Sequence, residues 1–140
     1  NGKLIKGLHL EFKEGKLVHF EAEEGRENFA RYVDNDAGSR YLGEVALVGT
    51  DSPIFQSGKI FEEILYDENA ACHIAIGFAY NLCLEGGPQM SQEELADVGC
   101  NVSTVHVDMM ISNEHVDVEA TTYDGQKIKL IQKGAWVNVI

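Results

Sequence analysis

Two side chains that could bind a metal stand two positions apart in an apolar stretch late in the sequence. Residues 104–111 are rich in Val, Met and Ile, and His106 and Asp108 lie among them. In a β-strand, residues i and i+2 point to the same face, so this imidazole and this carboxylate are expected to project side by side. Two such groups on one strand form half of a metal site. The simpler alternative is an exposed His–Asp pair on the solvent face of a sheet.

A single acid, Glu44, interrupts the apolar residues 41–48. This run is typical of a buried strand, and burying a carboxylate costs free energy unless a cation or another partner compensates its charge. Glu44 is therefore a second candidate ligand. Alternatively, it reaches solvent at a strand end or pairs with an Arg.

The third candidate group comes from residues 69–80, whose Ala and Ile content favours a helix. His73 and Tyr80 are seven residues apart, almost two helical turns, so a helix would place them on one face. An imidazole and a phenol on that face could bind a metal and hydrogen-bond a substrate. Glu68 stands at the expected helix start, where a carboxylate is favoured. The alternative is that Glu68 is a simple cap, His73 a hydrogen-bonded core residue and Tyr80 a packing residue.

Other residues of similar chemistry are expected to have structural roles. Three histidines alternate with charged residues in strand-like segments and are expected to be solvated: His9, His19 and His115. Three aspartates match no EF-hand spacing, so turn formation is favoured over calcium binding: Asp34, Asp36 and Asp51. The cysteines form no Cys-x-x-Cys pair and are expected to be free, buried thiols in a reducing cytoplasm: Cys72, Cys83 and Cys100.

The elements that must position these candidates alternate between strands and short helices. Strands are expected at residues 4–12, 17–22, 41–48, 104–111, 115–122, 127–131 and 136–140, and helices at 23–33, 69–80 and after the capping box that begins at Ser91. Residues 53–58 are expected to form a turn. No repeat or linker divides the chain. The sequence therefore predicts one α+β domain over residues 1–140, with a mixed or antiparallel sheet and two or three helices.

The net charge of −12, from 23 acidic and 11 basic residues among 140, excludes some partners. Such a surface repels phosphate backbones, which argues against nucleic-acid binding. The longest uncharged run, residues 69–84, is too short to cross a membrane. The start of the chain shows no signal-peptide pattern and no initiator Met, and we expect the chain to be a fragment or a processed piece of a longer one.

Four blocks of the sequence carry a resemblance to a known family. They are YLGEVALV at residues 41–48, DSPI at 51–54, DENAACHIAIG at 67–77 and HVDMMI at 106–111. In this order they resemble the C-terminal catalytic region of the aminopeptidase T, aminopeptidase S and PepS metallopeptidases. The resemblance covers nearly the whole chain. Ser112-Asn113 departs from the Gly-Ser that usually follows in the family.

The resemblance implies a cytoplasmic, bacterial, homodimeric metalloaminopeptidase that removes N-terminal residues from peptides with two divalent ions, zinc, cobalt or similar. It makes four residues metal ligands: Glu44, His73, His106 and Asp108. It makes Glu68 a further ligand or acid/base group, and Tyr80 a catalytic residue that stabilises the reacting carbonyl.

The resemblance also implies that something is missing from this chain. The family's bridging Glu and its N-terminal domain would lie upstream of residue 1, so residues 1–140 are expected to be a C-terminal metal-binding catalytic domain. Alone, such a fragment can lack the metals and is expected to be inactive. A non-catalytic acidic binding or assembly domain and a small calcium-binding module are the competing interpretations.

Overall fold

The computed structural model describes residues 5–137, and their contacts divide the chain into two compact units. The first unit comprises Asn1–Glu44 and Ile74–Asp108, and the second comprises Val45–His73 and Met109–Ile140. The described part combines short α-helices with three small sheets, which confirms the predicted α+β class. None of its helices has both the length and the apolar character needed to cross a membrane.

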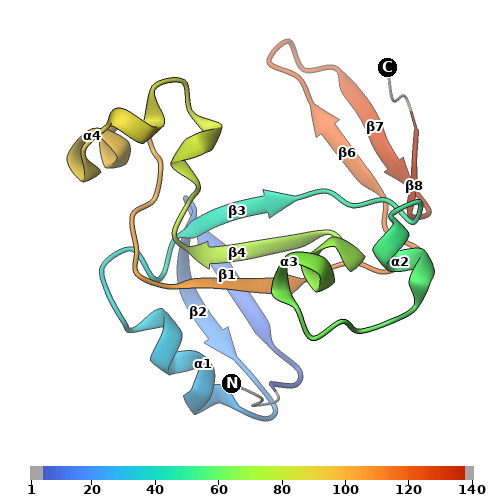
Figure 1. The fold of residues 1–140 in the computed structure, drawn as a ribbon, viewed down its shortest axis with the longest axis horizontal. Helices are drawn as coiled ribbons and strands as arrows, with labels where there is room; N and C mark the ends of the chain where they lie inside the picture. Colours follow the sequence, from blue (N-terminus) through green and yellow to red (C-terminus); the bar gives the residue numbers. More distant parts are fainter. Residues whose placement is uncertain (1–4, 138–140) are drawn as a thin grey trace. The chain divides into compact units, whose positions relative to one another are not determined.

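The first unit opens with an antiparallel hairpin (Figure 1). Its strands are β1 (His9–Lys13) and β2 (Lys16–Glu21), as the alternation of apolar residues around the Gly15 turn predicts. Helix α1 (Arg26–Val33) follows, and its Phe29 ring packs edge-on against Phe20 with centroids 5.2 Å apart. Most of the buried apolar side chains among residues 5–137 belong to this unit: Leu17, Phe20, Phe29, Val33, Ala75, Ile76, Leu95 and Cys100.

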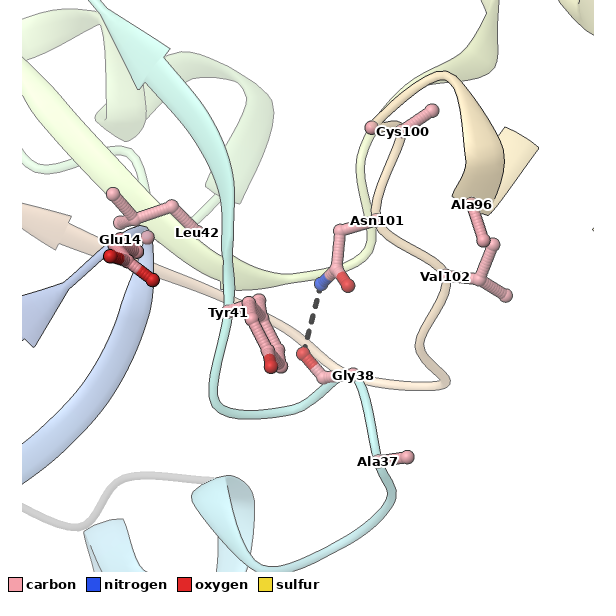
Figure 2. Close-up of a pocket in the computed structure, with 11 residues that line it drawn as sticks. Glu14, Ala37, Gly38, Tyr41, Leu42, Ala96, Cys100, Asn101 and Val102 are labelled. Carbon is pink, nitrogen blue, oxygen red and sulfur yellow. Dashed lines mark hydrogen bonds between the residues drawn. The ribbon is translucent and has the colours of Figure 1, made fainter. Parts of the chain in front are cut away.

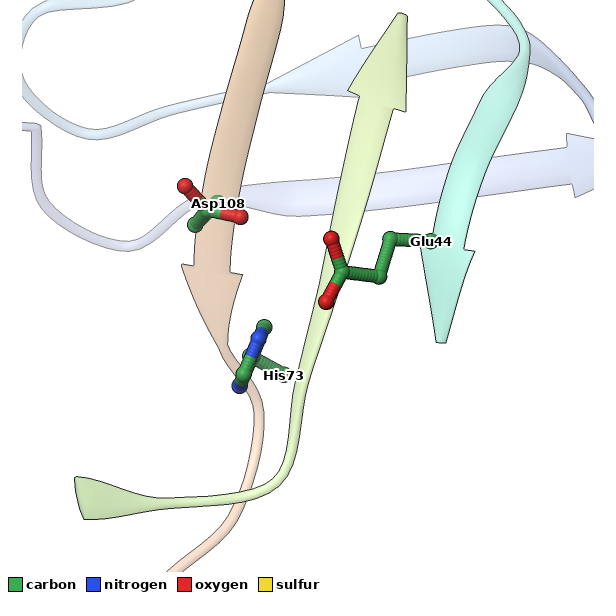
Figure 3. A group of neighbouring side chains, drawn as sticks. All are labelled: Glu44, His73 and Asp108. Atoms are coloured by element: carbon green, nitrogen blue, oxygen red, sulfur yellow. The ribbon is translucent and has the colours of Figure 1, made fainter. Parts of the chain in front are cut away.

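A three-stranded sheet carries the candidate residues. Its strands lie in the order β3 (Leu42–Ala46), β4 (His73–Gly77) and β5 (His106–Met110), and the arrows in Figure 3 show that the central strand runs opposite to its neighbours.

Short helical segments connect these strands. They are α2 (Pro53–Ser57), α3 (Ile64–Asp67), η1 (Glu68–Ala70), η2 (Asn81–Cys83), η3 (Gly87–Gln89) and α4 (Gln92–Asp97). The Ser91 capping box is confirmed, because Ser91 Oγ accepts from the Glu94 N–H and a Glu94 carboxylate oxygen accepts from the Ser91 N–H. The expected turn at 53–58 is instead helix α2, with Pro53 in its first turn and Gly58 ending it in a left-handed conformation.

The second unit ends in an antiparallel sheet of β6 (Val118–Thr121), β7 (Lys127–Gln132) and β8 (Ala135–Trp136). The Asp124-Gly125 turn joins β6 to β7, as predicted, with Gly125 at a φ of 84°. The final predicted strand extends to residue 140, and its last three residues lie outside the described part.

The predicted helix at residues 69–80 is wrong. Residues 73–77 form β4, whose side chains are nearly all buried. A short apolar run bounded by turns is ambiguous between a buried helix and a buried strand, and here β3 and β5 hydrogen-bond to it on both sides. The helical face shared by His73 and Tyr80 therefore does not exist.

Candidate metal centre

Strand β5 places His106 and Asp108 on one face, as their spacing predicts. His106 Nε2 lies 3.2 Å from Asp108 Oδ1, and the two side chains are only 21% and 13% exposed. The alternative of an exposed pair on a solvent face does not hold.

Glu44 on β3 completes this contact within the first unit. Its Oε2 lies 3.2 Å from the same His106 Nε2, and its side chain is 26% exposed. The expectation that its strand is fully buried is wrong, because the neighbouring Val45 is 67% exposed. The partner of Glu44 in this contact is an imidazole and not the Arg considered as an alternative.

The other ring nitrogen of His106 decides what Nε2 can do. Nδ1 lies 2.7 Å from the Phe78 carbonyl oxygen, and since a carbonyl only accepts hydrogen bonds, Nδ1 must carry the proton. In the neutral imidazole, Nε2 is then an electron pair facing two carboxylate oxygens. Three electron-rich atoms at this distance repel one another unless a proton or a cation supplies positive charge between them.

His73 repeats this arrangement at the start of β4. The side chain is 2% exposed, and Nδ1–H donates to the Ala71 carbonyl oxygen at 3.0 Å, which leaves Nε2 available as a ligand atom. Glu44, His73 and Asp108 each offer one ligand atom, and these three atoms lie within 4.8 Å of one another (Figure 3).

The donor set fits a divalent cation. It combines imidazole nitrogens with carboxylates, which suit zinc, cobalt and related ions. Asp108 Oδ1 is buried and accepts no hydrogen bond among the described residues, although His106 Nε2 lies 3.2 Å away. A buried anionic oxygen in this state is compensated when a cation binds to it.

Tyr80 lies beside this group for a reason other than helical spacing. Its ring contacts the His106 ring edge-on at 5.5 Å between centroids and the Phe78 ring at 5.4 Å. The residue is 47% exposed. Tyr80 thus presents a partly solvated phenol next to an imidazole whose Nε2 faces two carboxylates.

Glu68 lies in η1 of the second unit. It is not one of the three residues whose ligand atoms lie within 4.8 Å of one another. Its role as a further ligand or acid/base group stays a prediction.

The remaining titratable candidates behave as the sequence predicts, except that Cys83 is exposed and not buried as expected. His9, His19 and His115 have exposed side chains beside glutamates. The three cysteines are free thiols, with Cys72 and Cys100 buried and Cys83 exposed. Sequence analysis missed the carbonyls of Ala71 and Phe78, which orient the two imidazoles, because a main-chain acceptor leaves no signal in residue type.

A separate pocket of about 470 Å³ lies in the first unit (Figure 2). Its lining is mainly apolar and backbone and contains none of the candidate ligands. The side chain of Asn101 stands at this pocket and donates to the Gly38 carbonyl oxygen at 2.9 Å. The lining residues are Glu14, Gly15, Ala37, Gly38, Tyr41, Leu42, Ala96, Gly99, Cys100, Asn101 and Val102.

Comparison with known proteins assigns the chain to a family. The family model described as thermophilic metalloprotease (M29) matches residues 1–136, and the chain belongs to this M29 metalloprotease family.

Named relatives agree with that assignment. The chain is 45% identical over 135 residues to aminopeptidase AmpS of Bacillus subtilis and 47% identical over 137 residues to aminopeptidase T of Thermus aquaticus. These alignments cover 96% and 98% of this chain and 33% of each relative.

A solved structure, wild-type AmpT from Thermus thermophilus, superimposes with a TM-score of 0.85 at 46% identity. The superposition covers 97% of this chain and 33% of that one. The chain thus spans about a third of the length of the relatives it matches.

Proposed function

We propose that this chain supplies the metal-binding part of an aminopeptidase that hydrolyses N-terminal residues from peptides. The observation that carries the proposal is the shared orientation of His73 and His106. Both give their Nδ1 proton to a main-chain carbonyl, and the Nε2 of His106 meets two carboxylate oxygens at 3.2 Å. The family assignment and the printed names of the relatives support a peptidase.

Four side chains would hold the metal: Glu44, His73, His106 and Asp108. Glu68 is proposed as a further ligand or as the acid/base group, and two divalent ions are proposed, with ligands outside this chain completing the pair. When bound, a divalent cation polarises the scissile carbonyl and lowers the pKa of water.

The side chains around this centre have separate tasks. The hydrogen bonds to the Phe78 and Ala71 carbonyl oxygens orient the rings of His106 and His73 and assign the proton of the neutral imidazole to Nδ1, so that Nε2 carries the electron pair that would bind a metal. The phenol of Tyr80, held by its ring contacts, donates a hydrogen bond to the oxygen that becomes negatively charged when the carbonyl is attacked. A carboxylate, Glu68 or one outside this chain, takes the proton from the attacking water.

The length of the relatives shapes the rest of the proposal. We place residues 1–140 as the C-terminal metal-binding catalytic domain of a cytoplasmic, homodimeric bacterial enzyme, with peptides as substrates. Because the chain spans about a third of its relatives' length, we propose that other parts of the complete protein contribute to the substrate site and that the isolated chain is inactive.

The test compares the complete natural protein with residues 1–140 alone. Each is freed of metal with a chelator, dialysed, and supplied with Zn²⁺ or Co²⁺, and release of the chromophore from leucine p-nitroanilide is followed. We expect metal-dependent turnover by the complete protein and none by the isolated chain. Turnover that survives metal removal, or its absence in the metal-loaded complete protein, would contradict the proposal and favour a binding or assembly role.

A matched pair of variants connects the activity to these ligands. His106→Ala in the complete protein is expected to lower both metal content and turnover. His115→Ala removes an exposed imidazole of the second unit and is expected to change neither. Equal effects of the two variants would exclude His106 as a ligand.

A further inference from the structure

Asp36 receives an unusual number of hydrogen bonds for a residue in a surface loop. Its Oδ1 accepts from the Gly38 N–H at 3.0 Å and the Ser39 hydroxyl at 3.0 Å. Ser103 Oγ lies 2.9 Å from Oδ1 and 3.1 Å from Oδ2. Thr104 donates to Oδ2 from both its N–H and its hydroxyl at 2.7 Å.

These donors have a clear effect on the acid. The N–H of Thr104, together with the hydroxyls of Thr104, Ser103 and Ser39, holds the pKa of Asp36 far below its usual range, against the opposing effect of burial. Asp36 is therefore a carboxylate near neutral pH. All the donors named here are neutral.

The hydrogen bonds connect two loops that are distant in sequence. Asp36, Gly38 and Ser39 precede β3, whereas Ser103 and Thr104 precede β5. All of these residues belong to the first unit. Asp36 thus ties the loop that leads to Glu44 to the loop that leads to His106.

Close backbone packing reinforces the tie. A Cβ on Gly38 would stand 1.9 Å from the Val102 carbonyl oxygen, so only glycine allows the two loops to approach this closely. The Asn101 side-chain amide donates to the carbonyl oxygen of Gly38 at 2.9 Å (Figure 2) and to that of Gly77 at 2.6 Å.

This connection between the two loops lies next to the candidate ligands. Thr104 is two residues before His106, and the intervening Val105 accepts at its carbonyl from the Phe78 N–H at 2.7 Å. Phe78 in turn accepts from His106 Nδ1. Glu44 lies on β3, directly after the loop that contains Asp36. A shift of the 103–105 loop relative to the Asp36 loop would therefore move the His106 imidazole relative to Glu44.

We propose that Asp36 is a positioning residue for the metal centre: by joining the loops before β3 and β5, it sets the approach of His106 to Glu44. This inference rests on the metal binding proposed above. It gives a role to a residue that the sequence suggested to be a simple turn former. Residues that orient ligands without touching the metal typically change affinity by about 10- to 100-fold when they are replaced.

The test uses the complete protein with Asp36→Asn, which keeps the size of the side chain but turns an amide toward the Thr104 donors. The matched control is Asp124→Asn. Asp124 accepts from the Thr122 hydroxyl and the Gln126 amide in the β6–β7 turn, its pKa is also lowered by such bonds, and it belongs to the second unit. Thr104→Val is a milder variant that loses one hydroxyl donor and keeps the N–H.

Two readouts separate positioning from plain stability. The first is the Co²⁺ dissociation constant by calorimetry at a temperature where all variants are folded, and the second is the visible spectrum of bound Co²⁺, which reports ligand geometry. We expect affinity to fall about tenfold or more and the spectrum to change in Asp36→Asn, with smaller changes in Thr104→Val and none in Asp124→Asn.

Each other outcome overturns the inference in a distinguishable way. If the wild-type protein binds no Co²⁺, the proposed metal centre fails and the inference fails with it. If wild type and Asp36→Asn bind Co²⁺ with equal affinity and identical spectra, the inference alone fails, whatever the change in melting temperature. Should Asp36→Asn not fold, a Thr104→Val protein with wild-type affinity and spectrum would overturn it equally.

Discussion

Replacing Tyr80 by Phe in the complete protein should slow turnover and leave metal binding intact. The substitution removes one hydroxyl and keeps the ring, so the edge-on contacts with His106 at 5.5 Å and Phe78 at 5.4 Å survive. Since Tyr80 is 47% exposed, the hydroxyl is not buried in a core, and the free energy of unfolding should change by no more than about 0.5 kcal/mol. Loss of one donor to a developing oxyanion lowers kcat by roughly 10²- to 10³-fold.

The assay is steady-state hydrolysis of leucine p-nitroanilide, with metal content measured on the same samples. Tyr66→Phe is the matched control, because Tyr66 is also exposed and also rests against a Phe ring, that of Phe61 at 5.6 Å. It should keep wild-type kcat. If Tyr80→Phe retains wild-type kcat, Tyr80 only packs against His106. If instead it strips the metal, the phenol is a ligand or supports one, and the proposed role is refuted.

Three further predictions concern the ligands and the backbone that holds them. His73→Ala should lower metal content, measured by atomic emission, with turnover falling in proportion; full metal content would remove His73 from the ligand set. Gly77→Ala should lower the free energy of unfolding, measured by chemical denaturation, far more than Gly125→Ala. Both glycines have a positive φ, which strains an alanine by about 1–3 kcal/mol. Only at Gly77 would the new Cβ also stand 2.1 Å from a carbonyl oxygen. Because folding lowers the pKa of Asp36, the ionised Asp36 side chain stabilises the folded protein. This contribution is fully present above the unfolded-state pKa of about 4 and is lost as the pH falls from there through the lower folded-state pKa. The melting-temperature deficit of Asp36→Asn should therefore be largest near neutral pH and shrink below pH 4, and a deficit that grows with acid would contradict this.

Local signals predicted much of the fold. The hairpin around Gly15, the Asp124-Gly125 turn and the Ser91 capping box each depend on residues within a few positions, and all three are confirmed. Helix α2 also had a local signal that was available, a Ser-Pro start with Gly58 at its end.

The error at residues 69–80 shows what local reasoning cannot supply. Ala and Ile in an uncharged run fit a helix, and only the pairing of β4 with strands some thirty residues away on either side makes it a central strand. Tyr80 was therefore selected for a helical face that does not exist, yet the segment that follows β4 places its ring beside that of His106.

In the candidate site, too, the local contacts could be predicted from the sequence and the long-range ones could not. The pairing of His106 with Asp108 follows from strand periodicity alone, which needs no knowledge of the rest of the chain. The approach of Glu44 and the contribution of Asp36 depend on loops about seventy residues apart, and no spacing rule reports such a distance.

The acceptors that orient His73 and His106 are main-chain carbonyls, those of Ala71 and Phe78. A carboxylate in this position could be lost by a single substitution, whereas a carbonyl oxygen is present in every amino acid. The side chains at these two positions are thus free to be varied without changing the tautomer of either imidazole. Libraries of substitutions at residues 71 and 78 should therefore retain many metal-binding members. Substitutions that change the backbone conformation, such as those at Gly77, should be tolerated much less.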